Sequence, residues 1–290
     1  MSILTNSKTK VIIQGITGTQ ASFHVSRSID YGTNVVGGVT PGRGGTTHLG
    51  VPVFDTVKEA VAQTGADASV MFVPAPAVKS AVAEAVEAGV KLLVCITAGV
   101  PVHDMLAIRQ ILKGSQTKLI GPNTPGLLVP EETRLGIYPE NIHRRGHIGL
   151  ISRSSTLTYE AALEINRAGM GQSTVVAIGD DMIIGMDFVE GLKLFHADDE
   201  TEAIVMVGQI GGNFEEDAAA WYATQRSQKP IICYIAGNDT TFRNHVGYAG
   251  DIITRGRVTL SGKKKTMSQS GMIVVNNISQ IHEVLSSITK

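Results

Sequence analysis

Short runs of β-branched and aliphatic residues alternate along the chain with longer stretches in which apolar residues recur every three or four positions. In the first half, strands are expected at Val11 to Ile13, Val35 to Val36, Val70 to Val73, Leu92 to Ile96 and Leu119 to Ile120. Helices are expected to include Val57 to Gln63, Val78 to Ala88 and Met105 to Leu112. Strands that alternate with helical patterns predict a parallel sheet with right-handed crossovers. The first half is therefore expected to be a Rossmann-like α/β domain.

A proline- and glycine-rich passage beginning at Gly121 interrupts this rhythm before the apolar run Ile148 to Ile151 restarts it. The domain join is placed in this passage. Further strands are expected at Val175 to Ile178, Ala203 to Val207 and Ile231 to Tyr234. Further helices are expected near Leu157 to Ala168, Phe188 to Phe195, Glu215 to Thr224 and Gln280 to Ile288. This repeated alternation predicts a second doubly wound sheet.

Composition narrows the functional classes. The 290 residues are 43% hydrophobic and 18% charged with a formal net charge of -1, which is typical of a globular protein of about two domains. Such a charge predicts no nucleic-acid or membrane partner, and the basic run Lys263 to Lys265 is interpreted as a solvated face. Cys95 and Cys233 are interpreted as reduced core thiols. With no secretory signal and no apolar run of about 18 residues, a cytoplasmic protein is expected.

A glycine turn follows the first expected strand. The residues Gly15-Ile16-Thr17-Gly18-Thr19-Gln20 lead from that strand into a helix. Glycines release the backbone at such a turn while the helix N–H groups point outward, so that an anion can bind. A plain tight turn between strand and helix would give the same pattern.

A second glycine-rich loop, Val39 to Gly45, carries Arg43. An NAD-binding domain would favour an acidic residue about 20 residues after the glycine turn, where it accepts from ribose hydroxyls. An arginine suits instead an additional phosphate, as in NADP or CoA. The alternative is a solvent-facing arginine.

Other strand ends are expected to meet at the same edge of the parallel sheet and form a binding wall. These ends are Val73-Pro74-Ala75-Pro76, Ile96-Thr97-Ala98-Gly99 and Gly121-Pro122-Asn123-Thr124-Pro125-Gly126. In the second half, Ser152-Arg153-Ser154-Ser155-Thr156 places hydroxyls and an arginine at a helix start, which favours an oxyanion site over an ordinary N-cap.

Four segments together resemble the α subunit of succinyl-CoA synthetase over nearly the whole chain. They are Gly15 to Gln20, Gly37 to Gly50, Gly121 to Gly126 and Ser152 to Glu160. In that family the α subunit binds CoA and carries a phosphohistidine, which an ATP-grasp β subunit charges from ATP or GTP. The phosphoryl group then passes to succinate before CoA attacks. The resemblance implies a Rossmann-like CoA-binding domain at residues 1–122, a connecting segment at 123–147 and a flavodoxin-like ligase-type domain at 148–290.

The resemblance also implies the ligand-binding residues. Arg43 replaces the family's usual lysine and keeps its charge, and Tyr159 would lie near the acid substrate. The phosphoryl group would be held by Ser154, Ser155 and Thr156, of which Ser155 replaces the family's glycine. CoA would be bound by Thr17, Gly18, Thr19, Gln20, Val39, Pro41, Arg43, Val73, Pro74, Ile96, Thr97, Ala98 and Asn123. No histidine spacing typical of a metal site occurs. An ATP-grasp β-type subunit or a second copy of the chain is the expected partner.

Three positions depart from the family in the machinery of phosphoryl transfer. Tyr248 stands where the family has its phosphohistidine, and Ala98 and Gln209 stand where it has two glutamates that orient that histidine. A phenol with a pKa of about 10 is a poor phosphoryl carrier at pH 7. His245 lies three residues upstream, and an offset of that length moves a nucleophile by several Å.

The sequence therefore predicts a CoA-binding α-type subunit whose phosphohistidine route is lost or altered. Two alternatives stay open. One is a noncatalytic subunit that senses CoA or acyl-CoA. The other is an active acid–CoA ligase that uses His245 or no phosphohistidine.

Overall fold

The computed structural model describes residues 2–226, 229–237 and 259–288, and its contacts divide the chain into two units. The N-terminal unit contains residues 4–140 and 178–186, and the C-terminal unit contains residues 1–3, 141–177 and 187–290. Tyr248 and His245 lie outside the described residues. The predicted α/β class, with two largely parallel sheets, is confirmed.

The sheet of the N-terminal unit has the order β3-β4-β2-β1-β5-β6-β7. Its strands are β1 Val11–Gln14, β2 Val35–Val39, β3 Thr47–His48, β4 Val51–Phe54, β5 Ala68–Met71, β6 Leu92–Cys95 and β7 Lys118–Ile120. Only β3 runs antiparallel to its neighbour β4. Without β3, the strands follow the chain order 3-2-1-4-5-6 of a dinucleotide-binding sheet, so the Rossmann-like prediction is confirmed.

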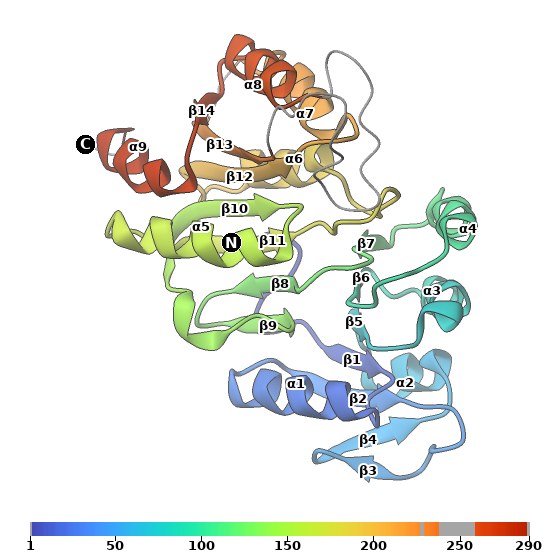
Figure 1. Ribbon diagram of the computed structural model, residues 1–290. Coiled ribbons are helices and arrows are strands. Elements are labelled where there is room, and N and C mark those ends of the chain that lie inside the picture. The colour runs from blue at the N-terminus through green and yellow to red at the C-terminus, as the bar shows by residue number, and fades with distance from the viewer. Residues whose placement is uncertain (1, 227–228, 238–258, 289–290) are drawn as a thin grey trace. The chain divides into compact units, whose positions relative to one another are not determined.

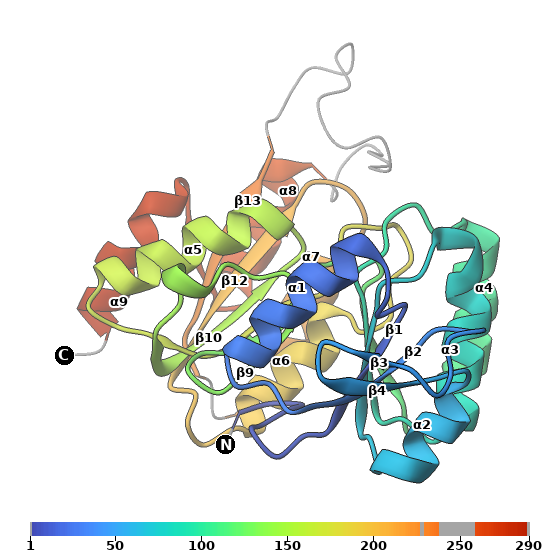
Figure 2. The same ribbon diagram turned by 90° about the horizontal axis from the view of Figure 1, so that it is seen from below.

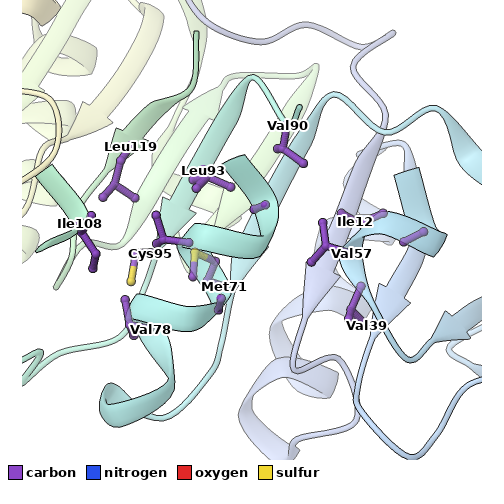
Figure 3. Close-up of a cluster of buried hydrophobic side chains, with 14 of the residues drawn as sticks. Ile12, Val39, Val57, Met71, Val78, Val90, Leu93, Cys95, Ile108 and Leu119 are labelled. Atoms are coloured by element: carbon purple, nitrogen blue, oxygen red, sulfur yellow. The ribbon is translucent and has the colours of Figure 1, made fainter. Parts of the chain in front are cut away.

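Helices cover both faces of this sheet, which is why its central strands β1, β5 and β6 are buried along their whole length and mostly apolar. They are α1 Thr19–Asp30, α2 Val57–Thr64, α3 Val78–Glu87 and α4 Val102–Leu112, with a 3₁₀ turn, η1, at Ala75–Ala77. Figures 1 and 2 show α1 on the opposite face from α2, α3 and α4. Under these three helices, Met71 and Leu93 from the strands pack with Val78 and Ile108 from the helices (Figure 3). The same unit contains an antiparallel hairpin of β8 Gly126–Val129 and β9 Thr133–Gly136, and β9 contacts α1.

Residues 178–186 follow a strand of the C-terminal unit in sequence but belong to the N-terminal unit. Backbone hydrogen bonds join this segment to the end of β7: Gly185 N donates to Gly121 O (2.8 Å) and Met186 N donates to Leu119 O (2.7 Å). A Cβ atom on Gly185 would lie 2.2 Å from Leu119 O, so only glycine allows this approach. The N-terminal unit is therefore built from two separate parts of the sequence.

The C-terminal unit contains a parallel sheet in which the strands follow the order β14-β13-β12-β10-β11. Its strands are β10 Arg145–Ser152, β11 Gln172–Ala177, β12 Ala203–Gln209, β13 Ile231–Ala236 and β14 Ile273–Val275. Counted along the chain this is the order 2-1-3-4-5, which confirms the flavodoxin-like prediction.

Helices α5 Ser155–Arg167 and α9 Ile281–Ile288 contact each other on one face of this sheet, as Figure 1 shows. On the other face, α7 Phe214–Tyr222 contacts both α6 Phe188–Ala197 and α8 Leu260–Gln269. Two 3₁₀ turns, η2 Glu140–Ile142 and η3 Ile278–Gln280, complete the helical elements of the described residues. No helix in the described ranges has the length and apolarity that a membrane crossing requires.

A buried ion-pair network lies between α7, α8 and the loop after β12. Lys263 Nζ lies 2.7 Å from Glu215 Oε2 and 2.7 Å from Glu216 Oε2, and it donates to Gly212 O at 2.9 Å. The Arg153 guanidinium contacts Glu215 from the other side at 3.5 Å. Glu215 Oε1 also accepts from the backbone N–H of Gln209 (3.0 Å).

The interpretation of the lysine run as a solvated face is wrong for Lys263, because this side chain is fully buried. Lys265, two positions further along α8, is exposed. A buried ammonium is tolerated only where carboxylates and carbonyl groups replace its bound water. The Lys263 ammonium has two carboxylates and one carbonyl as partners. The network therefore ties the start of α8 to the glycine-rich loop at 208–213.

Replacing Lys263 should be far more damaging than replacing Lys265. We expect Lys263→Ala to lower the free energy of unfolding by about 3 kcal/mol, because it leaves the buried Glu215 without its closest cation. Chemical denaturation measures this value. Lys265→Ala, in the same helix, is the matched control and should change stability little. Equal losses in the two variants would show that the buried pairing does not stabilise the fold.

Candidate functional site

The predicted glycine turn joins β1 to α1 at the point where the strand order reverses. Gly15 has a φ of +82°, and a Cβ atom there would lie 2.8 Å from Phe72 O. Gly18 is the N-cap of α1 and provides no side-chain cap. The first N–H groups of α1 therefore have no side-chain acceptor, and the N-terminal side of the helix favours an anion.

The loop that carries Arg43 lies beside this turn. Thr17 Oγ1 lies 3.3 Å from Thr40 Oγ1 and so connects the two segments. Within the loop, Arg43 N donates to Thr40 O (3.0 Å) and Thr46 Oγ1 donates to Arg43 O (2.7 Å). The Arg43 side chain is exposed and has no carboxylate partner among the described residues. It is a cation held on an ordered backbone and available to a ligand phosphate.

His48 supports the same region, a contact that the sequence did not predict. Its Nε2 atom lies 2.8 Å from Ser22 Oγ in the first turns of α1. The Ser22 hydroxyl also lies 2.9 Å from Gly18 O, one turn earlier in the chain. The hydrogen bond ties β3 to the start of α1.

The strand ends for which a binding wall was predicted are joined by hydrogen bonds in the N-terminal unit. Thr97 Oγ1 donates to Val73 O (2.6 Å), and Asn123 N donates to Thr97 O (2.9 Å). These bonds hold the ends of β5, β6 and β7 together. Ile96 is half-buried beside Thr97, whereas Ala98 is exposed.

The other residues implied to bind CoA lie on the same edge or in the glycine segments. Val39 is buried at the end of β2, and Pro41 is exposed in the loop that follows. Gly18, Thr19, Gln20 and Pro74 are exposed. The structure thus brings the predicted CoA-binding residues together along one edge of a single sheet.

One carboxylate at this edge was not predicted from the sequence. Asp181 Oδ1 accepts from Asn123 Nδ2 at 3.0 Å. Burial raises the pKa of Asp181, and the hydrogen bond from Asn123 partly opposes this effect. Nearby, burial raises the pKa of the Cys95 thiol to about 12, so this cysteine is neutral at pH 7 and is no nucleophile.

A second hydroxyl cluster lies at the start of α5 in the C-terminal unit. Ser154 is the N-cap and accepts from Leu157 N at 3.3 Å. Ser154 O in turn accepts from Ser152 Oγ (2.8 Å) and from Thr158 Oγ1 (2.6 Å). The Ser154 hydroxyl therefore already serves as a cap.

The remaining residues predicted for the phosphoryl site also lie on α5. Ser155 is the first residue of α5 and is half-buried, Thr156 is exposed, and Tyr159 is half-buried one turn further on. Gln209 is buried at the end of β12 in the same unit. Ala98 belongs to the other unit.

Comparison with known proteins identifies both units. Residues 6–99 match the family model of a CoA binding domain, and residues 151–273 match that of a CoA-ligase. The chain is 47% identical over 292 residues to a succinate–CoA ligase [ADP-forming] subunit alpha of Aquifex aeolicus, covering 100% of this chain and 95% of that protein. It is 49% identical over 288 residues to subunit alpha 2 of the same enzyme from Archaeoglobus fulgidus, covering 99% of this chain and 100% of that protein.

Solved structures agree on the fold. An ATP citrate lyase from Methanothrix soehngenii, in complex with citrate and coenzyme A, superimposes with a TM-score of 0.87 at 20% identity. The match covers 98% of this chain but only 50% of that chain. On the strength of its full-length sequence relatives, this chain belongs to the family of succinate–CoA ligase α subunits, and its N-terminal unit contains a CoA-binding domain.

Proposed function

We propose that the chain is the CoA-binding α-type subunit of an acid–CoA ligase in which the phosphohistidine route has been lost or altered. CoA binding is supported by two features together: the α1 N-terminus has no side-chain cap, and the exposed Arg43 has no carboxylate partner in the part of the chain that the structure describes. CoA supplies phosphates for both, a diphosphate and a phosphorylated ribose. The strand-end residues Thr97 and Asn123 offer polar groups for the uncharged remainder of CoA.

The assignment of individual residues follows the same logic. Thr17, Gly18, Thr19 and Gln20 would hold phosphate oxygens through backbone N–H groups and hydroxyls. Arg43 would neutralise a phosphate that the helix start cannot reach. Gly15 lets the chain pass close to Phe72 O at this turn, where a Cβ atom would lie only 2.8 Å away.

CoA should bind the isolated chain with micromolar affinity, about -8 kcal/mol. Arg43→Ala should weaken this binding about tenfold or more, because a hydrogen bond to a charged group contributes about 1.5 to 3 kcal/mol. Isothermal calorimetry measures both values. Arg27→Ala is the matched control, since Arg27 is exposed near the other end of α1 and packs over Phe23. Absence of CoA binding, or equal binding by the Arg43 variant, would remove the central claim.

The proposal that phosphoryl transfer is lost rests on three positions. Tyr248 replaces the phosphohistidine, and a phenol is both poorly ionised at pH 7 and a poor phosphoryl donor once esterified. Ala98 and Gln209 replace the two glutamates that orient the histidine in the family. An imidazole keeps its tautomer and direction only through such a partner. All three changes remove groups that serve the same chemical step.

The phosphate-binding end of α5 is proposed to remain usable. Ser155 and Thr156 are in the first turn of α5, where backbone N–H groups and the helix dipole favour an anion. The Ser154 hydroxyl already accepts from Leu157 N as the helix cap. Ser154 would therefore help to bind phosphate by keeping the first turn of α5 in place. Tyr159, one turn further, would lie near the acid substrate.

These assignments predict the outcome of a labelling experiment. With a competent β subunit and labelled ATP, the native chain should acquire no acid-labile phosphate. A Tyr248→His, Ala98→Glu, Gln209→Glu triple variant should acquire some, and Tyr248→His alone should acquire less. The α5 N-terminus still offers phosphate donors, each favourable dipole contribution being roughly 0.3 to 2 kcal/mol, and the glutamates restore the histidine's partners. Acid-labile label on His245 of the native chain would instead establish a displaced carrier.

The expected partner is a β-type subunit with an ATP-grasp domain, or a second copy of this chain. Support comes from the full-length relatives, which are each named as a subunit. Light scattering should show a species larger than the monomer, either for the purified chain alone or for the chain purified together with proteins from its native source. A strictly monomeric chain that retains no ATP-grasp protein on purification from its native source would count against this partner.

A noncatalytic subunit that senses CoA or acyl-CoA is the second candidate function, and the observation that favours it is Tyr248. CoA affinity without turnover, both alone and with a β subunit, would support it. Turnover with CoA, a nucleoside triphosphate and a panel of acids would support a working ligase.

A further inference from the structure

Asp181 is brought to the carboxyl edge of the N-terminal sheet by a segment that is anchored on both sides of it. Before it, Gly121 N donates to Ile178 O (3.2 Å), and after it, Gly185 N donates to Gly121 O (2.8 Å). Arg109 on α4 donates to Ile184 O (3.1 Å) and Gly185 O (3.3 Å). The position of Asp181 is therefore set by the backbone of the unit that contains the proposed CoA site.

Asp181 determines the orientation of the Asn123 amide. The backbone of Asn123 has a φ of +57° and its N–H donates to Thr97 O. Its side-chain Nδ2 donates to Asp181 Oδ1 at 3.0 Å. An ionised carboxylate can only accept, so a flipped amide would place Asn123 Oδ1 against another acceptor. No described residue donates to Asn123 Oδ1, which is left as a free acceptor of defined direction.

Asn123 also lies at a suitable distance from the proposed phosphate site. It follows β7, which is three strands from β1 in the order β1-β5-β6-β7. Adjacent strands are about 4.8 Å apart, so the two sites are separated by roughly 14 Å along the edge. A ligand with phosphates at the glycine turn could reach Asn123 only through a long arm. The arm of CoA is pantetheine, which contains amide N–H donors.

We infer that Asp181 is a positioning residue of the CoA site, which holds the Asn123 amide so that its Oδ1 accepts from an amide N–H of the pantetheine arm. This inference rests on the proposed CoA function. It assigns a ligand-related role to a residue from the second half of the chain, outside the matched CoA-binding region of residues 6–99. It also separates the site into a charged end that binds phosphates and an uncharged end that binds the arm.

The test compares two probes by calorimetry, namely CoA and adenosine 3′,5′-bisphosphate, which lacks the pantetheine arm. Asp181→Leu removes the acceptor at similar volume and should weaken CoA binding about five- to tenfold, the effect of about one hydrogen bond. The same variant should bind the bisphosphate as the parent does. Asp181→Asn can still accept from Asn123 Nδ2, so it should bind CoA within about twofold of the parent.

A double-mutant cycle tests whether Asp181 acts through Asn123. Asn123→Gly removes the amide and tolerates the positive φ. If the two residues act together, the Asn123→Gly, Asp181→Leu double variant should bind CoA no more weakly than Asn123→Gly alone. Thermal unfolding verifies that each variant is folded, and Asp181→Ala replaces Asp181→Leu if the leucine disrupts the segment.

Three outcomes would overturn the inference: unchanged CoA binding by Asp181→Leu, equal weakening of both probes, or fully additive losses in the cycle. Each leaves the proposed CoA function standing, provided that the parent binds CoA. A parent that binds neither probe would refute the proposed function together with this inference.

Discussion

The close approach of backbone segments at two glycines is the constraint on which the ligand edge of the N-terminal unit depends. A Cβ atom on Gly15 would lie 2.8 Å from Phe72 O, and one on Gly185 would lie 2.2 Å from Leu119 O. Both neighbours are main-chain atoms of the sheet region and cannot move aside as a flexible side chain can. The first approach lets the chain turn from β1 towards α1 directly beside the end of β5. The second lets residues 178–186 run beside β7, and without it Asp181 could not reach Asn123.

The cations of the two units are used in opposite ways. Lys263 is fully buried, and its charge is balanced by Glu215 and Glu216, so it stabilises the fold and has nothing left for a ligand. Arg43 is exposed on a loop held by backbone hydrogen bonds and has no carboxylate partner among the described residues. A buried charge must be paired, whereas an unpaired charge must stay near water until a ligand replaces that water. Exposure and pairing, rather than residue type, thus distinguish a binding cation from a structural one.

Sequence patterns were sufficient for the two sheet topologies and for the glycine turn. Both follow from local rules, since apolar runs of strand length alternate with helical periodicity and glycine follows the first strand. The role of Lys263 was missed because a run of three lysines is usually solvated. Lys263 lies four positions before the apolar Met267, and positions four apart share a helix face, so the sequence did contain a sign that Lys263 faces the core. The Asp181–Asn123 pair spans 58 positions and depends on a segment that returns to the first sheet, which no local pattern can predict.

The arrangement of the site explains how one chemical step could be lost while the ligand is kept. The proposed CoA residues lie on one sheet edge and depend on backbone N–H groups, glycine packing and a single exposed cation. Two of the positions proposed to affect phosphoryl transfer, Ala98 and Gln209, take no part in the hydrogen bonds that hold the glycine turn or the Arg43 loop within the described part of the chain. Gln209 keeps its structural bond through its backbone N–H to Glu215, which does not depend on the side chain. The proposed changes at Ala98 and Gln209 are therefore compatible with the described hydrogen bonds of the glycine turn and the Arg43 loop.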